Sequence, residues 1–263
     1  MSISEKDWGA LYGFSLFETI LVHDGAPRWL ERHMLRITRS ARELGIAGAP
    51  DAAALARSVE QRLAANPYSH RVLRLTLTAG NPDSGIAPQV SITDRAISYS
   101  AADYNSGFPV ALCDAPRSAG SPVVRHKTAN QLENLLAWKS AARANCREAL
   151  FFNTCGLLTE GTRSNVFLVA ESGVVTPPVE AGLLPGLARE RALAILLQEG
   201  IPVREADVHR RDLRDWVECF LTNSIMPVMP VSRIGDFCFP APVPGSVTAL
   251  VRERMCQELG LVN

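Results

Sequence analysis

The chain has 263 residues, of which 47% are hydrophobic and 21% are charged, so a packed core is expected and extended disorder is not. Lysine and arginine together number 27, and so do aspartate and glutamate, a balance that argues against a general nucleic-acid binder. The six cysteines form no C-x-x-C pair, so the sequence predicts no zinc ribbon, no thioredoxin-like motif and no metal site.

The cysteines and the N-terminus bear on where the protein works. Single, scattered cysteines in a chain of this length are typical of reduced, buried thiols in a cytoplasm. The N-terminal segment MSISEKDWGALYG carries charges of both signs and no apolar stretch, so we do not expect a signal peptide. No run approaches the roughly 18 apolar residues of a membrane helix. We therefore expect a cytoplasmic protein without a membrane partner.

Strand and helix patterns alternate in the first hundred residues. Residues 14–23 predict a strand that ends in the turn DGAP. Residues 28–46 have apolar side chains at helical spacing and predict an amphipathic helix, and residues 51–66 predict a second helix. Residues 71–80 and 90–100 alternate as strands.

A polar segment that ends in glycine, AADYNSG at 101–107, follows these elements. We expect a linker there, between a smaller N-terminal α/β domain (1–100) and a larger C-terminal domain (108–263). The elements expected in the larger domain are a strand at 108–116, a helix from Asn130 to about Ala144, strands within 148–154 and 157–170, a helix at 187–201, strands within 217–237 and a last helix introduced by Pro242 and Pro244. The predicted class is α+β.

The stretch RHKTANQLENLLAW, residues 125–138, contains a lysine in an unusual setting. Lys127 is flanked by Arg125 and His126 and precedes a helix whose apolar residues gather toward one side, which predicts a buried helix. Taken alone, such a lysine is more often a surface side chain than a nucleophile.

Two stretches predict an anion site. In LLPGLARERAL a Pro-Gly pair leads into a helix, so the N–H groups of Leu187 and Ala188 would point outward at its positive end. In FLTNSIMP the small polar residues Thr222, Asn223 and Ser224 follow an apolar strand. The ordinary alternatives are a helix start without a ligand and a turn with local hydrogen bonds.

Two charged residues interrupt apolar patterns. Glu160 lies within a strand, where it is either an edge residue, a partner for Arg163, or a carboxylate held to bind a cationic ring nitrogen. Arg36 lies among apolar residues of the first long helix, where an arginine that extends its charge to water is the ordinary alternative.

Five stretches, in this order along the chain, together resemble the fold-type IV pyridoxal-phosphate enzymes, the class-IV aminotransferase family. They are FETILVHDGAPRWLERHMLRI, HKTANQLENLLA, LTEGTRSNVFLV, TPPVEAGLLPGLAR and FLTNSIMPVMPV. The family includes branched-chain aminotransferases, D-amino acid aminotransferases and 4-amino-4-deoxychorismate lyases. The resemblance implies a two-domain D-amino acid aminotransferase-like fold, pyridoxal 5′-phosphate as cofactor, a small-molecule substrate and a homodimer with the site at the domain interface.

The resemblance assigns the cofactor contacts one residue at a time. Lys127 matches the lysine that forms the Schiff base, Glu160 the acid that binds the pyridine nitrogen, and Arg36 the arginine that binds the phosphate. A freed Lys127 would then move protons at the substrate carbon. Glu160 would keep the ring nitrogen protonated, so that the ring can accept electrons.

The remaining cofactor contacts concern the phosphate. Leu187 and Ala188 match the helix-start pair whose N–H groups bind it, Ser224 matches the small hydroxyl residue that closes the phosphate cup, and Asn223 is a further candidate. Many relatives have threonine where this chain has Ala188, so we expect somewhat weaker phosphate binding. Relatives also usually begin with a short hairpin strand that is not apparent in MSISEKDWG, so we expect the small domain to lack an edge strand.

Three details favour the lyase over a transaminase. The stretch TNSIMPVMPV followed by IGDF resembles the lyase branch, and so does K-x-x-N-x-L-E from Lys127, where many transaminases have tyrosine at the position of Gln131. FET places Thr19 where branched-chain aminotransferases usually have glycine. We therefore predict that Lys127 and Thr19 are catalytic in the conversion of 4-amino-4-deoxychorismate to 4-aminobenzoate and pyruvate, in folate biosynthesis.

The substrate carboxylates need cations, for which Arg74 and Arg117 are candidates, with structural ion pairs as the alternative for both. The main alternative function is a branched-chain or D-amino acid aminotransferase that uses the same lysine. A relative that binds the cofactor poorly and serves as a structural protein is disfavoured, because Lys127, Glu160 and Arg36 are all present.

Overall fold

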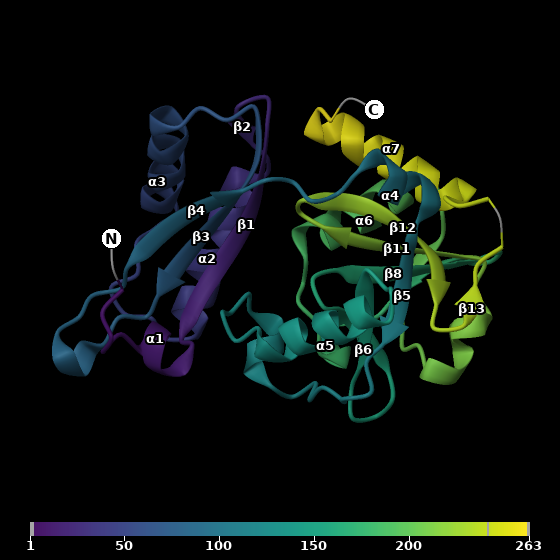
Figure 1. Ribbon diagram of the computed structural model, residues 1–263, viewed down its shortest axis with the longest axis horizontal. Coiled ribbons are helices and arrows are strands. Elements are labelled where there is room, and N and C mark those ends of the chain that lie inside the picture. Colours follow the sequence, from purple (N-terminus) through teal and green to yellow (C-terminus); the bar gives the residue numbers. More distant parts are fainter. Residues whose placement is uncertain (1–2, 241, 262–263) are drawn as a thin grey trace. The chain divides into compact units, whose positions relative to one another are not determined.

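Figure 1 shows the computed structural model, which describes residues 3–240 and 242–261. Contacts within the chain divide it into two compact units. Unit 1 contains the residues up to Ser98 and the segment His126–Gln131, and unit 2 contains Tyr99–Arg125 and the residues from Leu132 onward. Among the described residues, no helix is both long enough and apolar enough to cross a membrane.

Unit 1 is a four-stranded antiparallel sheet with helices packed on one face (Figure 1). Its strands are β1 (Ser15–His23), β2 (Ala26–Pro27), β3 (His70–Thr78) and β4 (Val90–Arg95), in the order β2-β1-β3-β4, and its helices are α1 (Trp8–Tyr12), α2 (Leu30–Glu43) and α3 (Ala52–Ala65). Alternate residues of a strand face opposite sides of the sheet. Leu16 and Ile20 of β1 share a buried cluster with Met34 and Ile37 of α2 and Leu55 of α3, so the helices cover that face.

The long helices and strands of unit 1 confirm the sequence patterns, with shifted ends. The strand expected at 90–100 ends at Arg95. Helix α1 was not predicted, because five residues carry too little periodicity. It is held by Asp7, whose carboxylate accepts hydrogen bonds from the Gly9 N–H at 2.6 Å and from Thr78 Oγ1 on β3 at 2.7 Å. A short helix is therefore fixed by a residue far away in the sequence.

The segment His126–Gln131 lies beside the first residues of β1. The Phe17 N–H donates to the Lys127 carbonyl at 2.9 Å, and the Ala129 N–H donates to the Ser15 carbonyl at 2.8 Å. An antiparallel bridge joins Leu16 to Thr128. Lys127 is thus held in an extended segment of unit 1, although the sequence analysis assigned it to the larger domain.

Unit 2 is built on a mixed nine-stranded sheet. Its strands run in the order β10-β9-β8-β11-β12-β5-β6-β7, and β13 pairs with β12. They are β5 (Phe108–Leu112), β6 (Glu148–Phe152), β7 (Leu158–Gly161), β8 (Asn165–Ala170), β9 (Gly173–Thr176), β10 (Val203–Glu205), β11 (Glu218–Asn223), β12 (Met226–Ile234) and β13 (Phe237–Cys238). All five residues of β6 are buried, as is typical of a strand covered on both faces.

The α-helices in the described part of unit 2 are α4 (Ala101–Ser106), α5 (Leu132–Arg143), α6 (Leu187–Gln198) and α7 (Ser246–Leu259). Helix α4 occupies most of the predicted linker, because Ser100 and Asp103 form a capping box at its start. The last helix begins at Ser246, after the two prolines. There the Glu218 carboxylate accepts the N–H groups of Val247 and Thr248, so a side chain from β11 supplies the missing cap.

The helix after Lys127 is not buried, contrary to the sequence prediction. Helix α5 begins at Leu132 rather than Asn130, and its apolar residues Leu132, Leu135 and Leu136 are 68%, 44% and 59% exposed. The inward side of the helix carries Ala141, which packs with Cys146 and Ala149. The apolar residues on one side of α5 therefore face outward from unit 2.

Candidate active site

Lys127 lies over an aromatic ring of unit 1. Its Nζ is 4.5 Å from the centroid of the Phe17 ring. The side chain of the preceding His126 contacts α2, with Nδ1 3.0 Å from Ser40 Oγ. The following Thr128 is buried, and its hydroxyl has no hydrogen-bond partner among the residues that the structure describes. The lysine is therefore anchored by its backbone and its neighbours.

Arg36 is one side of a buried ion pair on the helix-covered face of the sheet. Its Nε and Nη2 donate to the two carboxylate oxygens of Glu18 at 2.8 and 2.6 Å. His33 Nδ1 donates to the same carboxylate at 2.6 Å, and its Nε2 has no partner among the described residues. The pair uses two of the three guanidinium nitrogens and leaves Nη1 outside it. Arg36 is thus oriented by Glu18 rather than extended to water.

The charges of this cluster are set by burial and by Arg36. Burial by itself would raise the pKa of Glu18, but the charges of Arg36 and His33 and their hydrogen bonds lower it to about 2. Burial also lowers the pKa of His33, and the positive charges of Arg36 and Lys127 act in the same direction, against the effect of Glu18. At neutral pH the cluster therefore contains an ionised Glu18, a charged Arg36 and a neutral His33.

Thr19 and Arg74 face each other across β1 and β3. The two residues are directly paired in the antiparallel register, so their side chains lie on the same face of the sheet. The Arg74 guanidinium lies 3.7 Å from the centroid of the Phe17 ring, the ring that Lys127 also contacts. Burial and the positive charge of Arg95 lower the pKa of Arg74. Within the described residues this half-buried cation has no ion pair.

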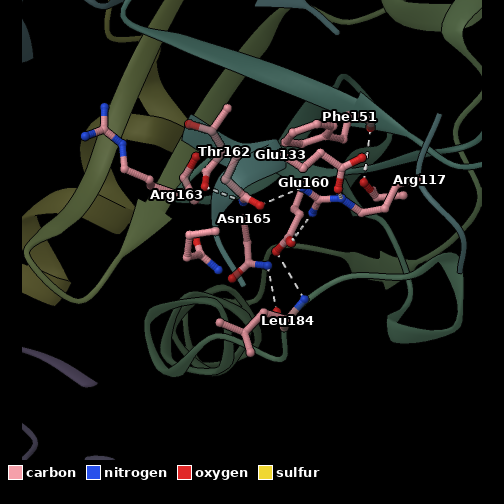
Figure 2. Close-up of polar contacts among 12 residues, drawn as sticks. Arg117, Glu133, Phe151, Glu160, Thr162, Arg163, Asn165 and Leu184 are labelled. Atoms are coloured by element: carbon pink, nitrogen blue, oxygen red, sulfur yellow. Dashed lines mark hydrogen bonds and ion pairs between the residues drawn. The ribbon is translucent and has the colours of Figure 1, made fainter. Parts of the chain in front are cut away.

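Glu160 lies at the centre of a polar cluster in unit 2 (Figure 2). Its Oε1 accepts from Arg117 Nη1 at 2.8 Å, and its Oε2 accepts from the Leu184 N–H at 3.1 Å. The residue is only 8% exposed. The predicted alternative partner, Arg163, instead places its guanidinium 4.7 Å from the ring centroid of Trp138.

Arg117 is itself enclosed on several sides (Figure 2). The guanidinium stacks 3.7 Å from the centroid of the Phe151 ring. Its Nη2 donates to Asn134 Oδ1 at 3.2 Å, and its Nε lies 3.3 Å from a Glu133 carboxylate oxygen. Arg117 was predicted to bind a substrate carboxylate. The geometry instead favours a role in orienting Glu160, because its charge is already paired there.

A second carboxylate supports the chain just after Glu160. The buried Glu148 accepts the N–H groups of Thr162 and Arg163 at 2.9 and 3.2 Å, and the Ser164 hydroxyl at 3.0 Å. It also accepts the Thr162 hydroxyl. The turn that follows Glu160 is therefore fixed by hydrogen bonds to one side chain.

The predicted phosphate contacts also lie in unit 2. Helix α6 begins at Leu187, and its N-cap, Gly186, supplies no side-chain hydrogen bond. A side chain at Gly186 would collide with Asn165 Oδ1, which explains the glycine. Leu187 and Ala188 are both buried, so their side chains anchor the helix while their N–H groups belong to its uncapped first turn.

The stretch Thr222–Ser224 spans the end of β11, whose last residue is Asn223. The Asn223 carbonyl oxygen Oδ1 accepts the N–H groups of Ile225 and Met226 at 3.0 and 2.7 Å, so this side chain shapes the turn. Thr222 is fully buried, and its hydroxyl has no partner among the described residues. Asn223 therefore forms a turn with local hydrogen bonds, which was the alternative to an anion site. The neighbouring hydroxyl, that of Thr222, is left unsatisfied.

Two residues next to these predicted sites were not predicted from the sequence. They are Glu18 and His33, which hold Arg36. An acid at an inward position of β1 was a usable signal for Glu18, because an unpaired buried carboxylate is strongly disfavoured. No comparable signal marks His33.

The chain resembles known proteins in sequence and in fold. It matches the family model described as amino-transferase class IV over residues 15–234. It is 26% identical over 260 residues to a D-alanine aminotransferase of Bacillus licheniformis, covering 97% of this chain and 90% of that protein. It is 23% identical over 240 residues to an aminodeoxychorismate lyase of Bacillus subtilis, covering 89% and 82% of the two proteins. A solved structure from Legionella pneumophila, provisionally named as a 4-amino-4-deoxychorismate lyase, is 27% identical with a TM-score of 0.85 and covers 99% and 95% of the two chains.

The protein belongs to the class IV aminotransferase family, because that model covers most of the chain. It is an enzyme that acts on a small molecule, and its cofactor is pyridoxal 5′-phosphate. The predicted family, fold class and cofactor are confirmed. The relatives of similar identity include both an aminotransferase and a lyase, so the comparisons define the family and not the reaction.

Features of each unit fit this cofactor. In unit 2, helix α6 lacks a side-chain cap at Gly186, and the buried hydroxyl of Thr222 has no partner among the described residues. In unit 1, Arg36 keeps Nη1 outside its pair with Glu18. Phosphate oxygens accept from such N–H, O–H and guanidinium donors. Lys127 supplies the amine that a cofactor aldehyde requires.

Proposed function

We propose that the protein is a 4-amino-4-deoxychorismate lyase, which converts 4-amino-4-deoxychorismate to 4-aminobenzoate and pyruvate for folate biosynthesis. The observation that carries the proposal is Arg74. This half-buried cation has no ion pair among the described residues and lies over the Phe17 ring. A substrate that has both carboxylates and a carbon ring fits a cation that lies beside an aromatic ring.

Lys127 is the proposed proton-transfer residue. Its amine takes the proton from C4 of the substrate ring, the bond between the ring and the enolpyruvyl oxygen breaks, and a proton delivered to the enol carbon completes pyruvate. Bound pyridoxal phosphate supplies an electron sink for the pair left at C4. The ring becomes aromatic, which drives the elimination. The Phe17 ring beside Lys127 Nζ limits where the amine can move.

Glu160 is proposed to receive the pyridine N–H. Each carboxylate oxygen has two lone pairs, so the bonds from Arg117 and Leu184 leave capacity for another donor. Arg117 places a positive charge 2.8 Å from Oε1 and is fixed by Phe151 and Asn134. Arg117 is therefore a positioning residue, and we assign the substrate carboxylate to Arg74.

The phosphate contacts are proposed for Arg36, for the N–H groups of Leu187 and Ala188, and for Ser224. Glu18 fixes the guanidinium plane of Arg36, so the direction of the N–H groups on the remaining nitrogen, Nη1, is fixed as well. Such prior orientation lowers the entropy that binding must overcome. The hydroxyl of Thr19, paired with Arg74 across the sheet, is proposed to orient the substrate or pass a proton.

A homodimer is part of the proposal. The family resemblance suggests it, and the exposed leucines of α5 support it, since a contiguous apolar surface commonly marks an interface. Light scattering of the purified enzyme should give twice the mass of 28.6 kDa. A monomer at micromolar concentration would contradict this part.

The test of the reaction is an end-point assay on the cofactor-loaded enzyme. The substrate is made in situ, 4-aminobenzoate is measured by fluorescence, and pyruvate is measured with a coupled dehydrogenase. Equal amounts of both products are expected, and Lys127→Ala should form neither while remaining folded. If an enzyme with a normal visible cofactor band forms no product, the proposal is wrong.

The second candidate is a transaminase, favoured by the 26% identity to the D-alanine aminotransferase, which exceeds the 23% identity to the lyase of Bacillus subtilis. It would use the same Lys127 but return the proton to the cofactor carbon. A panel of L- and D-amino acids with 2-oxoglutarate tests it. Keto-acid formation at rates far above any 4-aminobenzoate formation would replace the lyase proposal.

A further inference from the structure

A cluster of two histidines and an aspartate lies at one end of the sheet in unit 1. His23 is the last residue of β1 and is directly paired with His70, the first residue of β3. Their ring centroids are 4.5 Å apart. Asp24 follows in the turn between β1 and β2, with a left-handed φ of 49°. The turn therefore places the carboxylate beside both imidazoles.

The ligand atoms of the three side chains converge. His23 Nε2 lies 3.6 Å from Asp24 Oδ2, and His70 Nε2 lies 3.8 Å from Oδ1. All three residues offer a ligand atom within 4.8 Å of the others. Bonds of about 2.0–2.1 Å in a tetrahedral zinc site separate neighbouring ligand atoms by roughly 3.3 Å. Small side-chain rotations would therefore bring these atoms around one ion.

We propose that His23, Asp24 and His70 form a binding site for a late first-row divalent metal ion such as Zn²⁺. Imidazole and carboxylate are ligands that zinc accepts, and three protein ligands leave a position for water. The exposed fraction rises from 18% for the His23 side chain to 50% for His70 and 69% for Asp24, so an ion can enter from solvent.

The proposed site is separate from the candidate active site. His23 lies six positions along the strand from Phe17, the residue that contacts Lys127, which is roughly 20 Å at the usual rise. The ion would join the turn at Asp24 to β3, so its expected role is to stabilise this end of the sheet. This proposal differs from the prediction of no metal site, which considered only the cysteines. The two histidines are far apart in the chain and have no motif spacing, so only the pairing of β1 with β3 brings them together.

Zinc titration of the untagged holoenzyme by calorimetry tests the proposal. The exposed thiols of Cys155 and Cys238 are alkylated in every sample, because thiolates also bind zinc. We expect one bound equivalent in the wild type. His70→Asn should weaken it by more than roughly 10-fold, since losing even an outer-shell partner typically costs that much. Asp24→Asn should also weaken it, and asparagine tolerates the left-handed turn.

His209→Asn is the matched control, because His209 is an exposed histidine of unit 2. It should bind zinc like the wild type. Saturating zinc should also raise the unfolding temperature of the wild type and of His209→Asn, but not of His70→Asn. Equal zinc affinity in His70→Asn and the wild type would overturn the site, as would the absence of binding in the wild type. A histidine–aspartate ion pair without metal affinity would give that last result.

Discussion

A buried arginine–carboxylate pair is found in each unit, and the more deeply buried partner is the carboxylate in unit 1 and the arginine in unit 2. In unit 1 the carboxylate, Glu18, is fully buried, and Arg36 is 6% exposed. In unit 2 the arginine, Arg117, is 5% exposed, and Glu160 is 8% exposed. In each pair the slightly more exposed member is the one proposed to bind the cofactor. The deeper member holds it in place.

The difference follows from the charge of the group to be bound. A phosphate needs a cation, so unit 1 fixes a guanidinium with a carboxylate and leaves Nη1 outside the pair. A pyridinium N–H needs an acceptor, so unit 2 fixes a carboxylate with a guanidinium and a backbone N–H. A buried charge is costly unless it is paired, and pairing through hydrogen bonds also fixes its direction.

The largest effect is expected from breaking the pair in unit 1. Glu18→Gln leaves the Arg36 charge buried without its counter-ion, and removing one partner of such a pair costs roughly 3–5 kcal/mol. The midpoint of chemical denaturation of the apoenzyme should fall accordingly, and affinity for the cofactor should fall with it.

Glu43→Gln is the control for that variant. Glu43 is on the same helix as Arg36, but its side chain is 54% exposed, and its contacts with Arg39 and with His126 Nε2 are long, at 4.0 and 3.8 Å. The change should cost less than about 1 kcal/mol, as for surface pairs in general. Equal destabilisation by both variants would show that the Glu18 charge has no special role.

Acid should weaken unit 1 for the same reason. The pKa of Glu18 is lowered from 4.5 to about 2, so its contribution is complete above pH 4.5 and is lost as the pH falls toward 2. That contribution is roughly 3 kcal/mol. The lowered pKa of His33 adds a loss that begins below pH 6.5, because the buried ring must then take up a proton. Denaturation midpoints between pH 7 and pH 3 measure both.

Breaking the pair in unit 2 should lower the stability less, but it should change the absorption of the bound cofactor more clearly. Arg117→Met removes the donor to Glu160 Oε1, and a hydrogen bond to a charged group is worth roughly 2 kcal/mol. Because Glu160 then loses its orientation, the visible absorption band of the bound cofactor should change its position and its pH dependence. Arg163→Met, which removes a cation from Trp138, should leave that band unchanged. The same band shift in both variants would contradict a positioning role for Arg117.

Local sequence patterns predicted most of the fold because its main elements are periodic. Helix α2 and strand β1 have a regular apolar side, and both appear where expected. Helix α1 and the segment His126–Gln131 escaped prediction because distant residues hold them, Thr78 in one case and β1 in the other. The prediction that α5 is buried was wrong. An apolar stripe indicates that a helix face can pack against another surface, but it does not show that this surface belongs to the same unit.

The predicted site residues remain predictions, but the structure shows which of them have defined surroundings. The sequence pointed to Arg36, Glu160 and Arg117 as separate charges. Their partners are 18 to 43 residues away, so neither the Glu18–Arg36 pair nor the Arg117–Glu160 pair could be seen in local spacing. Arg117 therefore appeared to be available for substrate, whereas its guanidinium is already paired.

The smallest expected effect concerns the phosphate end. Ala188 lies in the first turn of α6, is 1% exposed, and stands where many relatives have threonine. Ala188→Ser adds a hydroxyl beside N–H groups that lack a side-chain cap. A new hydrogen bond of roughly 1 kcal/mol would lower the dissociation constant for pyridoxal phosphate about fivefold. Ala192→Ser is the control, because Ala192 is equally buried one turn further along. It should reduce stability without changing cofactor affinity. If both variants bind the cofactor equally, the first turn of α6 does not contact the phosphate. Arg36 of unit 1 must then bind the phosphate without help from that turn.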